Sequence, residues 1–453
     1  MDNTTNRKEN KMGIMPVNRL LVTMSLPIMV SMLIQATYNI VDSVFVSWIS
    51  EDALTAVSLA FPIQTLMIAV GVGTGVGINS ILSRRLGEKR YDDANKTAEN
   101  GIFLAILSWV LFAVFGLFFS ETFINAFTTD AEIIAMGTDY VYICTVFSFG
   151  VFIQIAAERI MQSTGNTIYN MVIQGCGAVI NIILDPILIF GWFGAPQLGV
   201  RGAAIATVIG QFVAMTLGII LNIKVNKEIS IKLRGFRPSL RIIKDIYRVG
   251  FPSIIMQSLS AVMTFGLNKI LLLYTETAVS VVGIYFKLQS FVFMPVFGLN
   301  SAMIPIIAYN YGAKNKERIN KTIRHTLTLS LLIMALGTLG FQFLAKDILK
   351  IFKASDEMMR IGVPALRIIS SCFPIAGIVI VFSSFFQAIG NGIYSMSMSL
   401  TRQIFVILPA AFILAKFVSL NSIWFAFPIS EFVTLTLCIF MFRHIYKKLI
   451  KPL

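Results

Sequence analysis

Twelve long apolar runs constrain the fold of this chain more than any other feature of its sequence. A membrane-spanning helix needs about 20 mostly apolar residues. Because a helix satisfies its own backbone hydrogen bonds in lipid, we expect every such run to be a helix. Continuous runs of this length exclude the short alternating strands of a β-barrel. The runs lie approximately at 17–41, 54–80, 101–120, 134–156, 168–192, 202–223, 247–273, 279–306, 324–344, 361–383, 393–416 and 423–446.

The composition agrees with a chain that lies mostly in lipid. Charged residues make up 13 % of the sequence and hydrophobic residues 56 %, whereas charged residues are about 25 % of a soluble domain. The predicted fold class is therefore an all-α integral membrane protein with twelve transmembrane helices.

The net charge of +14 is placed in a way that indicates membrane topology rather than nucleic-acid binding. Lys and Arg gather in both tails and in the loops after the second, sixth and eighth runs. The alternate loops "ISEDAL" and "SETFINAFTTDAE" have no basic residue. This positive-inside pattern predicts that both termini are cytoplasmic. One loop, 345–360, fits badly, because it carries Lys346, Lys350, Lys353 and Arg360 on the predicted outer side.

An internal repeat predicts two similar halves. After a shift of 225 residues, "QSTGNTIYNM" (162–171) lies over "QAIGNGIYSM" (387–396), and Pro27 lies over Pro252. Six runs separate equivalent positions, so equivalent helices share one orientation. Two bundles that face each other across a cleft suit transport by alternating access. The predicted parts are a cytoplasmic tail (1–16), a six-helix bundle (17–223), a cytoplasmic linker (224–246), a second six-helix bundle (247–446) and a cytoplasmic tail (447–453).

Ionisable residues inside the runs are candidates for function, because a charge in hydrocarbon is costly. Asp42 could also be a solvated helix end, and Glu158 could pair with Arg159 at the membrane interface. For Lys269 and Arg367 we expect side chains that reach to the interface. Lys287 and Arg402 lie deeper, where they line a cleft or pair with Glu431. Asp42, Glu158 and Asp185 are in the first half, whereas the second half contains four basic residues and one acid, Lys269, Lys287, Arg367, Arg402 and Glu431.

The stretch "INIILDPILIF" (180–190) predicts a cation site. Asn181 and Asp185 are four residues apart and share a helix face. Pro186 has no N–H, so the carbonyl of Ile182 loses its helical donor. These oxygens suit Na⁺, or a proton on Asp185. In the next run Thr207 lies one turn after Ala203 and offers a hydroxyl, although Asn181 could instead make a helix-packing hydrogen bond.

With these motifs the chain resembles the multidrug and toxic compound extrusion (MATE) family, in particular its bacterial MepA-like branch. "NIILDPILIFG" and "GVRGAAIATVIGQ" are similar to its fifth and sixth helices. "LPIMVSMLIQATYNIVDSVFVS" is similar to its first helix, and "RRLGEKRYDDA" to its loop after the second. The similarity covers about 17–445.

The resemblance implies secondary antiport across the bacterial cytoplasmic membrane, in which an organic cation leaves as Na⁺ or H⁺ enters. It implies small-molecule organic cations as substrates, and we expect a monomer in the lipid bilayer. It implies no cofactor beyond the coupling ion, no nucleic-acid partner and no catalytic residue. The implied cation-coupling residues are Asp42, Asn181, Asp185, Ala203 and Thr207. The implied substrate cavity is lined by Tyr140, Gln154, Glu158 and Asp185, with Gln154 where some relatives carry asparagine.

Two other classes of protein stay open at this point. A lipid-linked oligosaccharide flippase of the same superfamily would use basic residues in its cavity, and Lys287 and Arg402 are candidates. A membrane-embedded enzyme is less favoured, because the sequence has no metal-ligand spacing, nucleophile motif or phosphate loop. The Gly-rich stretch 71–79 lies in a run and indicates close helix packing. We expect the four cysteines (Cys144, Cys176, Cys372 and Cys438) to be small core residues.

Overall fold

The computed structural model describes residues 9–232, 234–352 and 354–453. Arg7 and Lys8 of the predicted N-terminal tail, and Lys353 of the loop at 345–360, lie outside these residues. The described part is helical and contains no strand. Its helices are α1 (Lys11–Ile14), α2 (Val17–Ser47), α3 (Glu51–Gly87), α4 (Tyr91–Asn125), α5 (Ala131–Val146), α6 (Phe149–Ser163), α7 (Ile168–Phe190), η1 (Trp192–Gly194), α8 (Val200–Lys224), α9 (Leu240–Leu272), α10 (Glu276–Gly312), α11 (Lys316–Ile351), α12 (Asp356–Ser370), α13 (Phe373–Ala388), α14 (Gly392–Leu400), η2 (Thr401–Ile407), α15 (Leu408–Phe417), η3 (Leu420–Phe425), α16 (Ala426–Ile445) and η4 (Tyr446–Ile450).

The predicted membrane-spanning architecture is confirmed. Ten helical segments of the described chain are long and apolar enough to cross a membrane. Two further spans are bent helix pairs, α5 with α6 at 43° and α12 with α13 at 48°. The runs 134–156 and 361–383, predicted as single helices, are therefore broken. Pro374 lies just after the second break, in the first turn of α13, where a missing N–H costs no helical hydrogen bond.

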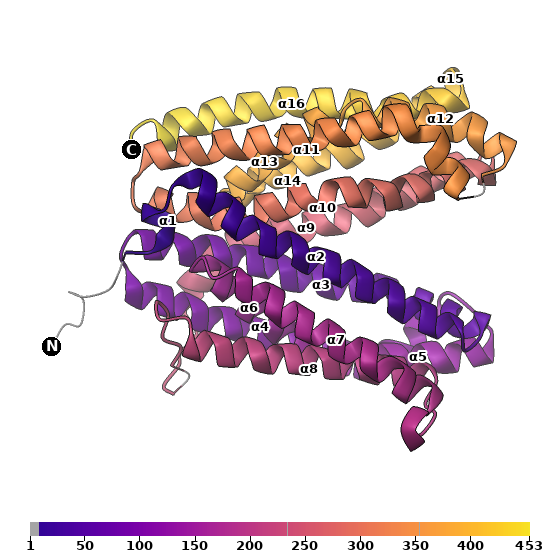
Figure 1. The fold of residues 1–453 in the computed structure, drawn as a ribbon, viewed down its shortest axis with the longest axis horizontal. Coiled ribbons are helices and arrows are strands. Elements are labelled where there is room, and N and C mark those ends of the chain that lie inside the picture. The colour runs from indigo at the N-terminus through magenta and orange to yellow at the C-terminus, as the bar shows by residue number, and fades with distance from the viewer. Residues whose placement is uncertain (1–8, 233, 353) are drawn as a thin grey trace.

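The helices form two layers along the long axis of the molecule. In Figure 1, α2–α8 make up the lower part and α9–α16 the upper part. The short helix α1 and the C-terminus lie together at the left, which we call the terminal end. The layers meet where α3 packs against α9 and α10, and where α2 packs against α10.

A pair of glycines brings the two layers into close contact near the terminal end. A β-carbon on Gly87 would lie 1.9 Å from the carbonyl oxygen of Tyr309, and one on Gly312 would lie 2.1 Å from that of Arg84. Both contacts are closer than any side chain permits, so only glycine fits. Gly87 and Gly312 are 225 residues apart, as are Arg84 and Tyr309. The sequence repeat therefore recurs as a symmetric contact between α3 and α10.

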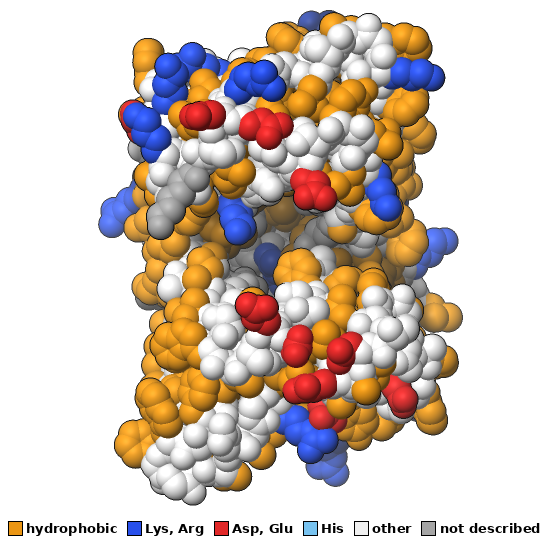
Figure 2. Space-filling model, turned by 90° about the vertical axis from the view of Figure 1, so that its right-hand side faces the viewer, with side chains coloured by type: hydrophobic (Ala, Val, Ile, Leu, Met, Phe, Trp, Pro, Cys, Tyr) orange, Lys and Arg blue, Asp and Glu red, His pale blue; other side chains and the backbone are white. Residues whose placement is uncertain are grey.

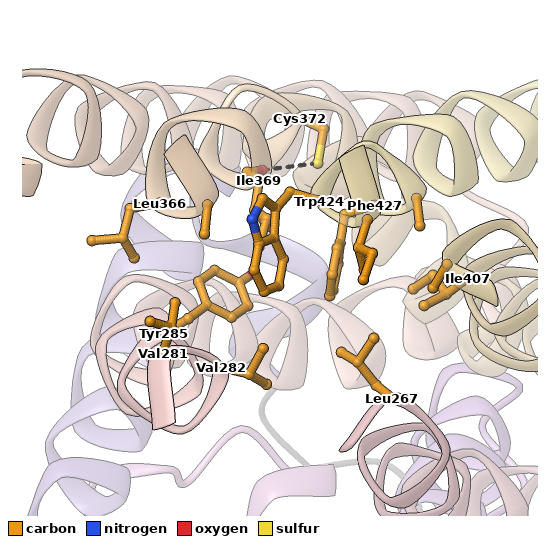
Figure 3. Packing of buried hydrophobic residues seen from close by; sticks show 14 of the residues in the cluster. Leu267, Val281, Val282, Tyr285, Leu366, Ile369, Cys372, Ile407, Trp424 and Phe427 are labelled. Atoms are coloured by element: carbon orange, nitrogen blue, oxygen red, sulfur yellow. Dashed lines mark hydrogen bonds between the residues drawn. The ribbon is translucent and has the colours of Figure 1, made fainter. Parts of the chain in front are cut away.

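The upper layer has a filled apolar core. Trp424 is fully buried there beside Tyr285, whose ring meets that of Phe427 edge to face at 5.8 Å. Figure 3 shows these side chains pointing toward one another from α10, η3 and α16, with Leu267 of α9 close by. Burial of such aromatic side chains is a large stabilising contribution. The lower layer differs, because it encloses a polar cavity.

Candidate functional site

The lower layer contains a cavity of about 540 Å³. Its lining comes from α2, α3, α5, α6, α7 and α8, all between Gln35 and Gln211. Six predicted site residues line it, namely Asp42, Tyr140, Gln154, Glu158, Asn181 and Thr207. Asp185 is fully buried and is joined to this lining by a hydrogen bond to Asn181. Ala203, in contrast, is fully buried in an apolar cluster and does not line the cavity.

The first polar group in the cavity is the oxygen cluster, which we define as Asp42, Asn181, Asp185 and Thr207. The Asn181 amide nitrogen donates to Asp185 Oδ1 at 3.3 Å and to Thr207 Oγ1 at 3.4 Å. Asp42, on α2, is close enough to Asp185 for their charges to interact. The structure thus brings together four of the five predicted cation-coupling residues.

Three buried oxygens of this cluster have no hydrogen-bond partner in the described part of the chain. They are Asp42 Oδ1, Asn181 Oδ1 and Asp185 Oδ2. A buried polar atom without a partner is costly, and buried carboxylates that repel each other are more so. A hard cation relieves that cost, because carboxylate, amide and hydroxyl oxygens are the ligands that hard cations prefer. A proton bound to one of the carboxylates also relieves it.

Small residues on α7 and α8 set the geometry of the oxygen cluster. A β-carbon on Gly210 would lie 2.8 Å from the Gly177 carbonyl oxygen and 3.2 Å from Asn181 Cβ. The two helices therefore approach closely one turn from Thr207. Pro186 remains inside α7, which ends with Gly191 in the left-handed conformation.

A second polar group lines the same cavity, and we call it the glutamate cluster: Gln154 and Glu158 of α6 with Gln174 of α7. Glu158 accepts hydrogen bonds from Gln154 Nε2 at 3.0 Å and from Gln174 Nε2 at 3.4 Å. Arg159 also lines the cavity, but its guanidinium donates to Gln162 at 2.8 Å rather than to Glu158. The interfacial Glu158–Arg159 pair is therefore not formed, and Gln154 acts as a donor to Glu158.

Several lining residues were missed by sequence reasoning. Gln35, Tyr38 and Asn39 of α2 line the cavity with Asp42, and so do Gln64 of α3 and Gln174 of α7. Gln64 Nε2 donates to the Tyr140 hydroxyl at 3.4 Å. The α2 residues could have been found, because polar residues at 35, 39 and 42 in an apolar run share one helix face. Single glutamines such as Gln64 carry no such pattern.

The basic residues of the second half do not line this cavity. Arg402 Nη1 lies 3.3 Å from Glu431 Oε1, so the alternative of an ion pair is confirmed. Lys287 is exposed. Lys269 and Arg367 are also exposed, as expected of side chains that reach to the interface.

The prediction that all four cysteines are core residues is wrong for Cys176. Cys144, Cys372 and Cys438 are buried, whereas Cys176 is exposed. Val172, Val179 and Ile183 are exposed on the same face of α7. A small apolar residue suits the outward face of a membrane helix as well as its core.

Acidic side chains also gather on the surface of the lower layer. Figure 2 views the end opposite the termini, where a hollow separates the two layers; red side chains lie on both sides of it, whereas blue side chains lie mostly above it. Glu51 and Asp52 at the start of α3 are exposed, as are Asp130 and Glu132 at the start of α5. A rim of this charge attracts cations toward the lower layer.

Comparison with known proteins identifies relatives that match this chain over nearly its whole length. The multidrug export protein MepA of Staphylococcus haemolyticus is 27 % identical over 426 residues, which cover 94 % of this chain and 93 % of the relative. The protein of the same name from Staphylococcus aureus strain MRSA252 is 25 % identical over 417 residues, covering 92 % and 91 %.

Solved structures show the same fold. An outward-facing multidrug resistance MATE family transporter superposes with a TM-score of 0.90 at 24 % identity, covering 99 % of this chain and 100 % of that one. A MATE structure in the bent conformation gives 0.89 at 25 % identity, covering 96 % and 97 %. The sequence profile of the MatE family matches residues 27–187 and 252–413, one segment in each half. The chain therefore belongs to the MatE family of membrane transporters.

Proposed function

We propose that this chain is a secondary multidrug efflux transporter that exports amphipathic organic cations in exchange for Na⁺ or H⁺. Its MepA relatives are named multidrug export proteins and match more than nine-tenths of its length. As a member of a transporter family it is not an enzyme. The observation that supports a cationic substrate is the set of three carboxylates in and beside one cavity, Asp42, Glu158 and Asp185, of which Glu158 and Asp185 are buried.

Charge supports cations as substrates. At an effective dielectric of 20, two unit charges 4 Å apart interact by roughly 4 kcal/mol. Phe61, Met67 and Ile68 also line the cavity and offer the apolar contact that a drug-sized cation needs. Flat and flexible surfaces of this kind accept many shapes, which favours breadth of substrate over selectivity.

The oxygen cluster supports coupling to an ion. Asp42, Asn181 and Asp185 would hold Na⁺ through their unpartnered oxygens, or a carboxylate would hold a proton. Either event removes negative charge from the cavity wall. A cationic drug then binds more weakly, and by thermodynamic reciprocity the drug weakens ion binding equally. This competition is what an exchanger requires.

The flippase alternative has less support than it had from sequence. Its candidate residues were Lys287 and Arg402, neither of which lines the cavity, and Arg402 pairs with Glu431. The cavity contains one arginine, Arg159, beside its carboxylates. A pyrophosphate group would meet net negative charge there.

We propose that the chain is a monomer in the bacterial cytoplasmic membrane, with both termini on the cytoplasmic side. The basic loops support this orientation. The hollow between the layers then faces outward, and the Gly87 and Gly312 contacts close the cytoplasmic side. Alternating access requires that these contacts separate when the cavity faces inward.

Ethidium binding to the purified protein tests the proposal. Ethidium affinity is measured while Na⁺ replaces K⁺ at constant pH, and separately while pH changes at constant Na⁺. We expect one titration to weaken binding, and efflux from vesicles with that ion gradient identifies the coupling ion. Affinity that stays flat in both titrations contradicts competition within the cavity. Binding of lipid-linked sugars in place of ethidium would support the flippase alternative.

A further inference from the structure

A second cavity lies at the terminal end, outside the proposed transport site. Its volume is about 330 Å³, and we call it the arginine pocket. Its wall combines the end of α3 from the lower layer with parts of α9, α10, the turn before α14, and η4 from the upper layer. It therefore bridges the two layers. Its residues are Ile81, Arg84, Arg85, Glu88, Arg90, Arg241, Asp245, Arg248, Tyr311, Ile389, Gly390, Asn391 and Leu449.

Five arginines in this lining face only two carboxylates. Arg84 Nε lies 2.8 Å from Glu88 Oε1, and Arg85 Nη2 lies 2.8 Å from Asp245 Oδ2. Arg90 contacts Glu88 at 3.3 Å and also pairs with Asp93, just outside the lining.

The remaining two arginines of the lining make no ion pair in the described part of the chain. Arg241 and Arg248 lie on α9 and are exposed. The pocket is thus positively charged even after its internal pairs are counted, and it retains arginine groups free to bind an anion.

A helix N-terminus adds to this charge. α14 begins at Gly392, and the side chain of Asn391 makes no capping hydrogen bond. A β-carbon on Gly392 would lie 3.1 Å from the carbonyl oxygen of Arg248, so this helix end sits directly against α9. The first N–H groups of a helix and its dipole both favour an anion. Arg248 and the start of α14 therefore converge on one place.

The repeat supplies an internal comparison for this pocket. A shift of 225 residues places Gly390 over Gly165, and both have a positive φ of 84° and 87°. Around Gly165 the equivalent groove is filled by α1: a β-carbon there would lie 2.7 Å from Lys11 Cε. Asn10 Nδ2 donates to the Thr164 carbonyl oxygen at 3.0 Å. Around Gly390 nothing lies within 4 Å of such a β-carbon.

The two equivalent grooves also differ in charge. The positions equivalent to the five arginines are uncharged: Tyr309, Asn310, Asn315, Pro16 and Thr23. None of these five positions in the first groove carries an arginine, and this groove holds a lysine-bearing segment of the chain itself, where burial lowers the pKa of Lys11. The other groove is rich in arginine and open. The complementary occupant of the open groove is an anion.

We propose that the arginine pocket binds a phosphate group, carried by an anionic lipid headgroup or by a soluble phosphate. Arginine forms paired hydrogen bonds with phosphate oxygens. Ile81, Ile389 and Leu449 add apolar surface to the wall, which suits the acyl chains of a lipid next to its headgroup. Basic pockets between membrane helices on the cytoplasmic side bind such headgroups. Because both layers form the wall, the bound group holds the terminal end closed.

The test compares two double variants of the full-length protein. Arg241→Gln with Arg248→Gln removes the two arginines that make no ion pair. Lys447→Gln with Lys448→Gln removes the same charge from exposed residues of η4 that do not line the pocket. Binding of phosphatidylglycerol and of phosphatidylcholine is measured on purified protein by native mass spectrometry. Inorganic phosphate and pyrophosphate are titrated separately, with the melting temperature as readout.

We expect phosphatidylglycerol to bind in preference to phosphatidylcholine. The arginine variant should lose at least about tenfold in affinity, as for a lost charged hydrogen bond, and the lysine variant should keep it. Phosphate or pyrophosphate binding with the same dependence on Arg241 and Arg248 identifies a soluble ligand instead and supports the pocket equally. Equal losses in both variants, or no preference for any phosphate over phosphatidylcholine, overturn the proposal. None of these readouts depends on drug transport.

Discussion

At the residue scale, Asp185 is the group on which ion coupling most depends. It is fully buried, one of its oxygens has no partner in the described chain, and Asp42 is near. Asp185→Asn keeps the shape but removes the charge and the titratable proton. We expect this variant to insert normally and to lose gradient-driven ethidium efflux, with Asp42→Asn weaker in effect.

The matched control for this prediction is Asp347→Asn. Asp347 is exposed and pairs only with Lys350 in the described chain, so efflux should not change. Efflux from inverted vesicles is measured under Na⁺ and pH gradients in turn. Full activity of the Asp185→Asn protein under either gradient would remove Asp185 from the coupling site.

Glu158 supports a separate prediction about the substrate. Its carboxylate is held by amides of Gln154 and Gln174, so Glu158→Gln replaces a charge at nearly constant volume. We expect ethidium affinity to fall at least about tenfold, or about 1.4 kcal/mol. Affinity for an uncharged drug of similar size should change little. An equal loss for both ligands would indicate a disturbed cavity rather than a lost charge.

How much of the site could be predicted differs from residue to residue. Asn181, Asp185 and Thr207 could be grouped because their spacing places them on facing helices and the "LDP" motif marks them. The partner of Glu158 on α7, Gln174, could not be found, because contact between α6 and α7 depends on how the bent pair α5–α6 folds back. Ala203 was misplaced because helical spacing alone does not say whether a side chain faces the cavity or the apolar cluster.

At the scale of elements, glycines decide how closely helices pack. Gly312→Leu places a side chain where the carbonyl of Arg84 already lies. We expect a lower melting temperature, since overpacking of this kind costs about 1–3 kcal/mol. Gly283→Leu is the control, because Gly283 is on the same helix and a β-carbon there meets nothing within 4 Å. Thermal unfolding in detergent compares them, and equal melting temperatures would contradict the close contact.

The elements themselves were largely predictable, and their bends were not. Apolar length identifies spans because the lipid thickness fixes it. A break depends on local events, such as the turn at Ser148, whose hydroxyl donates to the Thr145 carbonyl at 2.7 Å. Helix ends were also set too short: α3 continues to Gly87 and α10 to Gly312. Polar residues can continue a helix beyond the lipid, so the end of an apolar run does not mark the end of the helix.

At the scale of the whole molecule, the repeat predicts two similar halves but not their differences. Trp424 and Tyr285 fill the core of the upper layer, whereas the lower layer keeps a polar cavity between equivalent helices. Likewise α1 fills one of two equivalent grooves. Such asymmetry arises from individual side chains and from the segment before the first repeat, neither of which a sequence shift reveals. As a result, the first half contains the cavity, whereas side chains fill the core of the second half.

The orientation of the whole molecule in the membrane can be tested by labelling single cysteines. α1, the segment 225–239 and the C-terminus should all face the cytoplasm, because basic residues gather there. Arg237 and Glu132 are both exposed, and they should lie on opposite sides. In a variant without native cysteines, of which only Cys176 is exposed, an impermeant reagent added to intact cells should label Glu132→Cys and spare Arg237→Cys. Inverted vesicles should give the reverse pattern.

Labelling of Arg237→Cys from outside intact cells would invert the assignment and place the arginine pocket and the Gly87–Tyr309 contact on the outer side. The basic loop at 345–360, which counts against the predicted orientation, would then conform to the positive-inside rule.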